Sequence, residues 1–267
     1  MAHKLGLLIQ GPLLSIGRGA KNYELAQGEM GEIIHYDCRK SIENNLKKYS
    51  ELFEEIIIST WSDEQISQDL ERLITQFSNL KLIQLNKSSH TRLEQRQYGN
   101  FTWHNNQLLQ YDGCYRGLLE FKVSDFIIRI RTDQEINIEE LIEDSINNTN
   151  AITVPAIHEA REYLCMDDFY FSGEVELLKS FCKAASEQSY HSAPQISPIF
   201  AFAALKLFNQ IKNKEKLISF WSNSFTHRLL AFQIVIKYLK PARKTIYMNL
   251  TWRGQKAAKH WASIHDY

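Results

Sequence analysis

Short apolar runs alternate with helical patterns along the first 85 residues, and this alternation restricts the fold more than any other feature. Residues 5–9, 54–61 and 80–85 are rich in leucine and isoleucine, as buried strands are. The segments between them, 41–53 and 62–77, have apolar residues at helical spacing. The resulting order β-α-β-α-β predicts an α/β fold, with a mainly parallel central sheet flanked by helices.

Polar residues follow these strands where each one ends. A further strand at 126–131 is followed by Thr132, Asp133, Gln134 and Glu135. In open α/β sheets, ligands bind outside the carboxyl ends of the strands. We therefore expect Gln10, Thr60 and Asp133 to converge on one edge of the sheet, within a ligand-binding site made of Gln10, Gly11, Pro12, Ser59, Thr60, Trp61, Asn106, Gln107, Arg129, Arg131, Asp133 and Gln134.

The acids after this strand suggest a cation site. Asp133 and Glu135 offer the oxygen ligands that hard divalent cations take, and such a cation would hold a diphosphate. Arg129 and Arg131 are two apart on a strand and share one face, so they are alternative charge clamps for the same group. On this view Asp133→Ala abolishes activity and leaves the fold intact. The competing interpretation is a solvated loop in which Arg131 and Asp133 form a surface pair.

A second acidic stretch, Asp167 and Asp168, precedes an aromatic run, a glycine and a helix. Adjacent acids serve as a base, as metal ligands or as an anchor for a sugar hydroxyl. Asp168, with Asp167 as the second choice, is the candidate catalytic base. The alternative is that Asp168 braces a turn.

The remaining segments carry weaker signals. Residues 14–31 contain four glycines and are expected to be a mobile loop over a site or an ordinary surface insertion. Residues 86–104 are expected to be a long loop, and 225–239 a helix. We place one region, which holds these candidate sites, at 1–185. A mostly helical region at 186–267 would pack on it.

Composition excludes several classes of protein. Lys+Arg and Asp+Glu both total 31, which argues against a nucleic-acid-coating protein. Four widely spaced cysteines indicate reduced thiols, and no export leader or spanning segment is expected, so a cytoplasmic location is predicted. Aromatic and basic residues alternate near the carboxyl end, which allows peripheral contact of 241–264 with the inner face of the cytoplasmic membrane, or packing of the tryptophans on the domain.

Five stretches of the sequence together resemble the WavE family, which is associated with lipopolysaccharide core and surface-polysaccharide synthesis. They cover most of residues 5–181 in order. The most specific are Ser-Thr-Trp at 59–61 and Arg-Thr-Asp at 131–133, and the full set is 8–12, 36–64, 105–107, 128–134 and 167–173.

The resemblance implies a GT-A-like glycosyltransferase that moves a sugar from a nucleotide-sugar donor to a bacterial surface glycan, such as lipopolysaccharide core, O-antigen or capsule. The site at the strand ends would then bind this donor, 1–185 would be the nucleotide-sugar-binding, catalytic region, and 186–267 would lie on the acceptor or membrane-surface side. Its acceptor would be a glycan or lipid-linked glycan. The strict Asp-x-Asp of metal-dependent GT-A enzymes is here Asp133-Gln134-Glu135, so a divalent cation, Mn or Mg, is an optional cofactor. A non-catalytic nucleotide- or glycan-binding protein and a phosphate-sugar transferase stay open as alternatives. The donor, the stereochemistry and the oligomeric state are left open.

Overall fold

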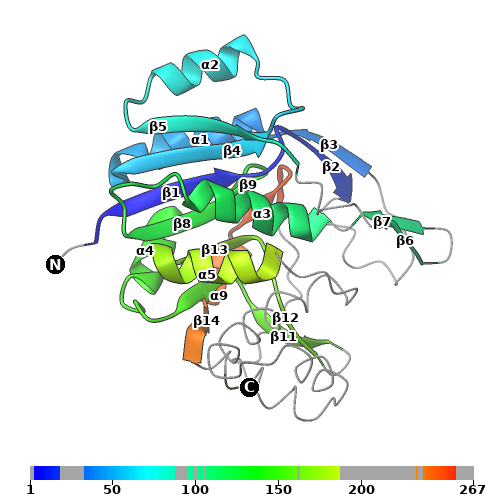
Figure 1. Ribbon diagram of the computed structural model, residues 1–267, viewed down its shortest axis with the longest axis vertical. Helices are drawn as coiled ribbons and strands as arrows, with labels where there is room; N and C mark the ends of the chain where they lie inside the picture. The colour runs from blue at the N-terminus through cyan, green and yellow to red at the C-terminus, as the bar shows by residue number, and fades with distance from the viewer. Residues whose placement is uncertain are drawn as a thin grey trace.

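The computed structural model describes residues 3–18, 33–87, 95–98, 101–104, 106–160, 163–186, 233 and 237–256. Its centre is a seven-stranded sheet in the order β14-β10-β13-β8-β1-β4-β5 (Figure 1). The bounds of these strands, in chain order, are β1 Leu5–Gln10, β4 Glu55–Trp61, β5 Leu80–Leu85, β8 Phe126–Arg131, β10 Ile152–Val154, β13 Tyr170–Glu174 and β14 Leu239–Pro241.

The sheet changes direction at one strand. β8, β1, β4 and β5 are all parallel, whereas β13 runs antiparallel between β8 and β10. Tyr170 at the start of β13 therefore pairs with Ile130 near the end of β8. The residues that precede β13 consequently lie at the edge where the parallel strands end.

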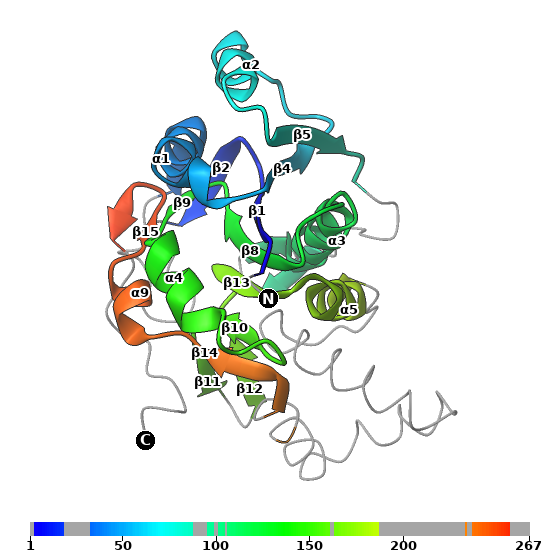
Figure 2. The ribbon, with the colours of Figure 1, turned by 90° about the vertical axis from the view of Figure 1, so that its left-hand side faces the viewer.

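Helices cover both faces of the sheet (Figure 2). Residues of α3 (Asn106–Leu118) and α5 (Val175–Ser186) form one buried cluster with Leu8, Ile57 and Ile127. The opposite cluster packs the other face of the same strands against the helices α1 (Arg39–Tyr49), α2 (Gln68–Thr75), α4 (Ile138–Ser145) and α9 (Lys244–Met248).

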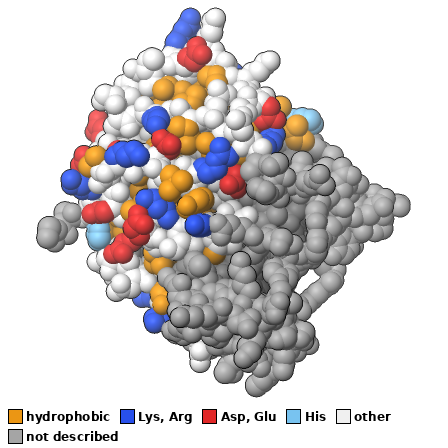
Figure 3. All heavy atoms as spheres, viewed as in Figure 1, with side chains coloured by type: hydrophobic (Ala, Val, Ile, Leu, Met, Phe, Trp, Pro, Cys, Tyr) orange, Lys and Arg blue, Asp and Glu red, His pale blue; other side chains and the backbone are white. Residues whose placement is uncertain are grey.

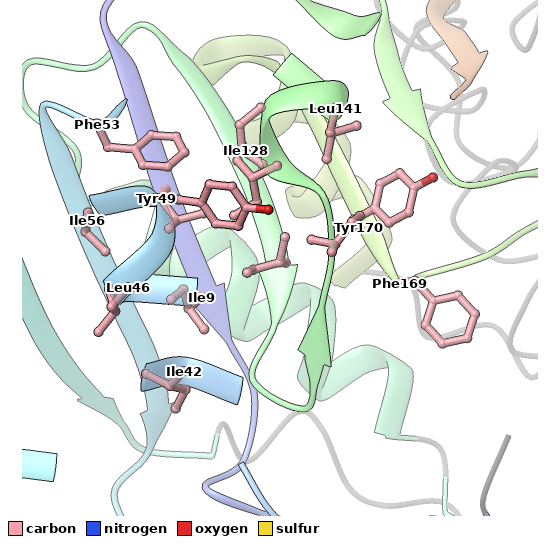
Figure 4. Packing of buried hydrophobic residues seen from close by; sticks show 14 of the residues in the cluster. Ile9, Ile42, Leu46, Tyr49, Phe53, Ile56, Ile128, Leu141, Phe169 and Tyr170 are labelled. Atoms are coloured by element: carbon pink, nitrogen blue, oxygen red, sulfur yellow. The ribbon is translucent and has the colours of Figure 1, made fainter. Parts of the chain in front are cut away.

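Alternate residues of the same strands belong to the two clusters, because successive side chains point to opposite faces of the sheet. Ile9 and Ile128 point to the side of α1 and α4, as Figure 4 shows together with Leu46, Tyr49 and Leu141. Their strand neighbours, one residue away, point to α3 and α5. The predicted mixed α/β class, with a mainly parallel sheet flanked by helices, is confirmed.

Two segments expected to be loops contain strands. The segment 14–31 begins with β2 (Leu14–Arg18), which pairs antiparallel with β3 (Ile33–Asp37), and residues 19–32 lie outside the described part. Within 86–104, β6 (Gln95–Tyr98) pairs with β7 (Phe101–His104). Both loop predictions were wrong for these residues. Backbone hydrogen bonds between the paired strands stabilise them, whereas the glycine-rich or polar composition did not indicate strands.

The described carboxyl-terminal residues add three short strands to the sheets, in addition to helix α9. The helix expected at 225–239 ends before Leu239, where β14 joins the central sheet beside β10, and most of that expected helix lies outside the described residues. β15 (Thr251–Trp252) pairs with β16 (Gln255–Lys256) and with β9 (Gln134–Glu135). Residues 187–232 of the mostly helical region expected at 186–267 also lie outside the described part, and the boundary at 185 stays a prediction.

The surface of the described part has mixed charge. On the face shown in Figure 3, basic and acidic side chains are interspersed with apolar ones. None of the described helices is long and apolar enough to cross a bilayer.

Candidate functional site

Three parallel strands end together at one edge of the sheet. Gln10 is the last residue of β1, and it pairs with Ser59 of β4 on one side and with Arg131 of β8 on the other. Thr60 is next along β4, and Asp133 follows β8 by two residues. The predicted convergence of Gln10, Thr60 and Asp133 on one edge is confirmed by this register.

The turn after β1 lies against the chain that leaves β8. Gly11 has φ +146°, and a Cβ there would lie 2.6 Å from the hydroxyl oxygen of Thr132, so only glycine permits this approach. Thr132 Oγ1 donates a hydrogen bond of 2.7 Å to the carbonyl of Pro12. Gly11 and Pro12 thus fix the spacing between two strand ends.

Asp133 is a buried carboxylate surrounded by donors. Arg131 donates to it from Nε at 2.9 Å and from Nη2 at 3.0 Å. Ser15 Oγ donates at 2.7 Å and Trp252 Nε1 at 3.0 Å, both to Oδ2. Arg253 Nε lies 3.3 Å from the same oxygen. The Arg131–Asp133 pair exists as expected, but it is buried, because Asp133 is only 1% exposed.

These partners determine the ionisation of Asp133. Burial by itself raises the pKa of this carboxyl, but the charges of Arg131 and Arg253 and the hydrogen bonds from Arg131 and Ser15 outweigh it and lower the pKa to about 2. Asp133 is therefore ionised at any physiological pH. Its oxygens are committed to groups of this chain, which argues for a role in holding the site together.

The predicted cation site does not fit this arrangement. A divalent cation at Asp133 would have to displace the donors described above. Glu135 lies on β9, where Asn44 Nδ2 donates to its Oε1 at 3.1 Å. Gln134 is also engaged: its Oε1 accepts from the backbone N–H of Arg131 at 3.2 Å, and it is fully buried. The described residues contain no group of three His, Cys, Asp or Glu side chains placed to hold a metal.

Arg129 is a fully buried guanidinium whose partners are neutral. Nη2 donates to Gln10 Oε1 at 2.6 Å, and Nη1 donates to the carbonyl of Asp168 at 2.6 Å. The guanidinium carbon lies 4.6 Å from the centre of the Phe171 ring. Within the described ranges no carboxylate pairs with it, and its Nε has no hydrogen-bond partner. A permanent positive charge is thus buried behind the ends of the strands.

Arg129 and Arg131 meet at one residue. Arg129 binds the backbone carbonyl of Asp168, while Arg131 Nη1 lies 3.6 Å from its carboxylate oxygen. Gln110 Nε2 donates to the same carbonyl at 3.1 Å. Two guanidiniums of one strand therefore hold the backbone and side chain of Asp168, whose side chain is 30% exposed.

The two adjacent acids differ sharply in environment. Asp167 is 5% exposed, and its Oδ2 has no hydrogen-bond partner among the described atoms. Burial, and secondarily the negative charge of Asp168, raise the pKa of Asp167 well above its ordinary value. Burial, and secondarily the negative charge of Asp167, raises the pKa of Tyr170, whereas burial and secondarily Asp168 raise the pKa of Tyr111; the two tyrosines belong to the clusters on opposite faces of the sheet.

The residues predicted on β4 divide between the two faces of the sheet. Ser59 and Trp61 lie on the side of α3, where Ser59 Oγ donates to the carbonyl of Gly113 at 3.4 Å. A Cβ on Gly113 would lie 2.9 Å from Gln10 Nε2 and 3.1 Å from Trp61 Cη2, so the helix backbone comes very close to the strand ends. Thr60 lies on the other face with a buried hydroxyl that lacks a partner in the described part.

Two predicted residues are placed only by their backbone. Asn106 and Gln107 form the first turn of α3, and their side chains lie outside what the structure describes. Their role at the site stays a prediction.

Sequence reasoning missed three partners of Asp133. Ser15 lies in a segment expected to be a loop, and Trp252 and Arg253 lie near the carboxyl end. In the sequence, the only indication of this hairpin is the dipeptide Arg253-Gly254. In the structure these two residues have φ values of +50° and +72° and make a two-residue hairpin turn. Glycine is usual at such positions, whereas arginine is uncommon there.

No protein-family model matches the chain, and no curated protein matches its sequence. Among solved structures, one described as a glucose-1-phosphate thymidylyltransferase of Bacillus anthracis with sucrose aligns with a TM-score of 0.41 at 9% identity, covering 95% of this chain and 91% of that one. HddC of Yersinia pseudotuberculosis aligns with a TM-score of 0.35 at 11% identity, covering 67% of this chain and 80% of that one. Its complex with GMP-PN aligns with a TM-score of 0.35 at 9% identity, covering 67% of this chain and 79% of that one. Alignments with TM-scores this low support no inference about the ligand or activity of this chain. The WavE resemblance stays a prediction.

Proposed function

We propose that this chain is a glycosyltransferase that takes a sugar from a nucleotide-sugar donor and passes it to a hydroxyl of a glycan acceptor. The observation that supports this most directly is the buried positive charge of Arg129 behind the ends of β1, β4 and β8. Its hydrogen bonds within the described residues go to the Gln10 amide oxygen and to backbone carbonyls, and no described carboxylate pairs with it.

An anionic group is the natural complement of this charge. A buried cation without a carboxylate partner is costly, and its field acts strongly in a site from which water is excluded. The leaving group of glycosyl transfer is a nucleoside phosphate or diphosphate, on which negative charge grows as the glycosidic bond breaks. Arg129 and Arg131 are suited to stabilise that developing charge.

Asp168 is the best candidate for the acceptor side of the reaction. Its carboxylate is partly exposed, and Arg131 holds it next to the positive charges. In an inverting transfer it would take the proton of the attacking hydroxyl while the sugar leaves the phosphate. Asp167 is less suited to this role, because it is only 5% exposed and its burial raises its pKa, which disfavours the ionised form that a base needs.

The biological acceptor follows from the sequence resemblance and belongs to the proposal. A WavE-like protein would extend a lipopolysaccharide core, an O-antigen or a capsule, and would work at the inner face of the cytoplasmic membrane. The interspersed charges in Figure 3 are consistent with a small or glycan ligand in preference to nucleic acid.

A panel of nucleotide sugars tests the proposed activity. The purified protein is incubated with each sugar, with and without Mn²⁺, and donor hydrolysis and thermal stabilisation are measured together, since a ligand of the folded state raises apparent stability. A glycosyltransferase slowly releases nucleotide from one donor. Stabilisation without any release, also after oligosaccharide acceptors are added, would instead identify a nucleotide- or glycan-binding protein. Recovery of a phosphate-linked sugar on the acceptor would identify a phosphate-sugar transferase.

A further inference from the structure

The β15–β16 hairpin reaches the site from the far end of the sequence. It pairs with β9 through Trp252 and Gln134, directly after the strand that bears the arginines. We propose that Trp252 and Arg253 are positioning residues, which hold Arg131 and the loop at Asp168 in their working geometry without touching the substrate.

The first line of contact passes through Asp133. Arg253 binds Asp133 twice, from its side chain at 3.3 Å and from its backbone N–H, which donates to the Asp133 carbonyl at 2.8 Å. Asp133 accepts two hydrogen bonds from Arg131, and Arg131 in turn lies 3.6 Å from the Asp168 carboxylate. Arg253 also donates to Ser15 at 2.9 Å, so β2 is tied to the same group.

The second line of contact passes through the indole of Trp252. Its Nε1–H donates to Asp133 Oδ2, and its ring packs edge-on against Phe169, with centroids 5.5 Å apart. The guanidinium of Arg131 lies 5.7 Å from the same ring, and that of Arg253 lies 4.4 Å from it. One side chain thus contacts both Arg131 and the residue that follows Asp168.

The backbone of the turn supports a role for the arginine side chain. Arg253 is the one residue other than glycine with positive φ in the described part of the chain. Glycine or asparagine would satisfy this turn with less strain. An arginine held in an unfavourable conformation, with its guanidinium at a buried carboxylate, is typical of a side chain that is needed where it lies.

Loss of the hairpin contacts should lower the rate more than the binding of donor. This consequence rests on the proposed function, because it assigns to Asp168 the acceptor proton. Arg253→Ala removes one of the two guanidiniums at Asp133 and leaves Arg131, Ser15 and Trp252 as its side-chain donors, which should change the position of Arg131 beside Asp168. Arg253→Lys keeps the charge and should restore part of the rate.

The physical coupling is measurable without any activity assay. Arg253→Ala, Asp168→Asn and the double variant are unfolded in urea, and their free energies of unfolding are compared. Arg253 and Asp168 share no direct contact in the structure, so independent sites would give additive changes. Coupling through Asp133 and Arg131 predicts clear non-additivity, and additivity would overturn the inference.

A matched control is Arg243→Ala, combined with Asp168→Asn. Arg243 lies in the same carboxyl-terminal segment but pairs with Asp144 on the surface, so its cycle should be additive. In an active preparation, Arg253→Ala should lower kcat about tenfold or more and leave KM within about twofold, with partial rescue by Arg253→Lys. A change confined to KM, or no rescue by lysine, would contradict the positioning role. An inactive wild-type protein with a non-additive cycle would refute the proposed function and retain the coupling.

Discussion

The two acidic stretches at the edge of the sheet have opposite physical characters. Asp133 is buried, lies against side-chain donors of four residues and is held ionised by a pKa of about 2. Asp168 has a partly exposed carboxylate that a single guanidinium approaches, and its neighbour Asp167 is buried with no donor to Oδ2 among the described residues. A carboxylate bound by several groups of its own chain stabilises the structure, whereas a partly exposed one can exchange a proton. The comparison therefore assigns stability to Asp133 and chemistry to Asp168.

The largest expected effect is on turnover in Asp168→Asn. The amide keeps the shape and loses the basicity, so we expect turnover to fall ~10²–10⁴-fold while donor affinity and melting temperature change little. Asp112→Asn is a matched control, since Asp112 also pairs with an arginine, Arg116, at a partly exposed position. Near-normal turnover in a folded Asp168→Asn protein would reduce Asp168 to a turn brace and direct attention to a retaining mechanism.

Removal of the Asp133 carboxylate should act mainly on stability. Asp133→Ala leaves Arg131 and Arg253 close together without their shared anion, and breaking a buried pair in this way costs ~3–5 kcal/mol. From the sequence alone we expected this variant to keep an intact fold. From the structure we now expect a loss of stability. Urea unfolding measures the change. Asp37→Ala, which breaks a partly exposed pair with Arg39, should cost no more than ~1 kcal/mol. Equal losses in the two variants would defeat the contrast.

Acid should remove the contribution of Asp133 within a defined pH window. Its pKa is lower in the folded protein, about 2, than the ordinary value of 3.8 that applies when unfolded, so the unfolded chain binds more protons between these values. The stabilisation, about 2 kcal/mol for a shift of this size, is complete above pH 3.8 and is lost as the pH falls towards 2. Unfolding curves of the wild type and of Asp133→Asn should therefore converge on acidification. Curves that stay parallel would show that Asp133 does not titrate there.

Asp167 should give a smaller effect of the opposite sign. Its pKa is raised in the folded state, so folding takes up a proton and stability falls as the pH rises above the unfolded value. Asp167→Asn removes this proton uptake, so the stability of the variant relative to the wild type should increase as the pH rises above the unfolded value. The pH profile of the free energy of unfolding checks this. A loss of stability that grows with pH would mean that the Asp167 carboxylate is ionised and paired.

The sequence predicted the parts of this molecule that depend on local pattern. The runs at 5–9, 54–61 and 126–131 became parallel strands, because apolar periodicity reports burial directly. Since parallel strands end at one edge, the convergence of Gln10 and Asp133 followed from the same pattern.

The partners of Asp133 could not be predicted in this way. Ser15 is 118 residues from Asp133, and Trp252 is 119 residues away on the other side. No periodicity relates such distant residues, so the Asp133 carboxylate looked available for a cation when only its neighbours in sequence were considered. The burial of Arg129 likewise could not be predicted from the sequence, because an arginine in a strand usually indicates an exposed face.

The hydrogen bond between Ser15 and Arg253 has a consequence for how the protein is made. It joins residues 238 positions apart, so it cannot form until nearly the whole chain has been synthesised. Closing so long a loop is entropically expensive and slow, and the parallel strands of the sheet do not by themselves supply it. During synthesis the strands β1, β4 and β8 emerge long before residue 253 leaves the ribosome. Until then Arg131 and Asp133 lack their carboxyl-terminal partners, so the strand edge should be the last part of the fold to mature and the part that most exposes a nascent chain to misassembly.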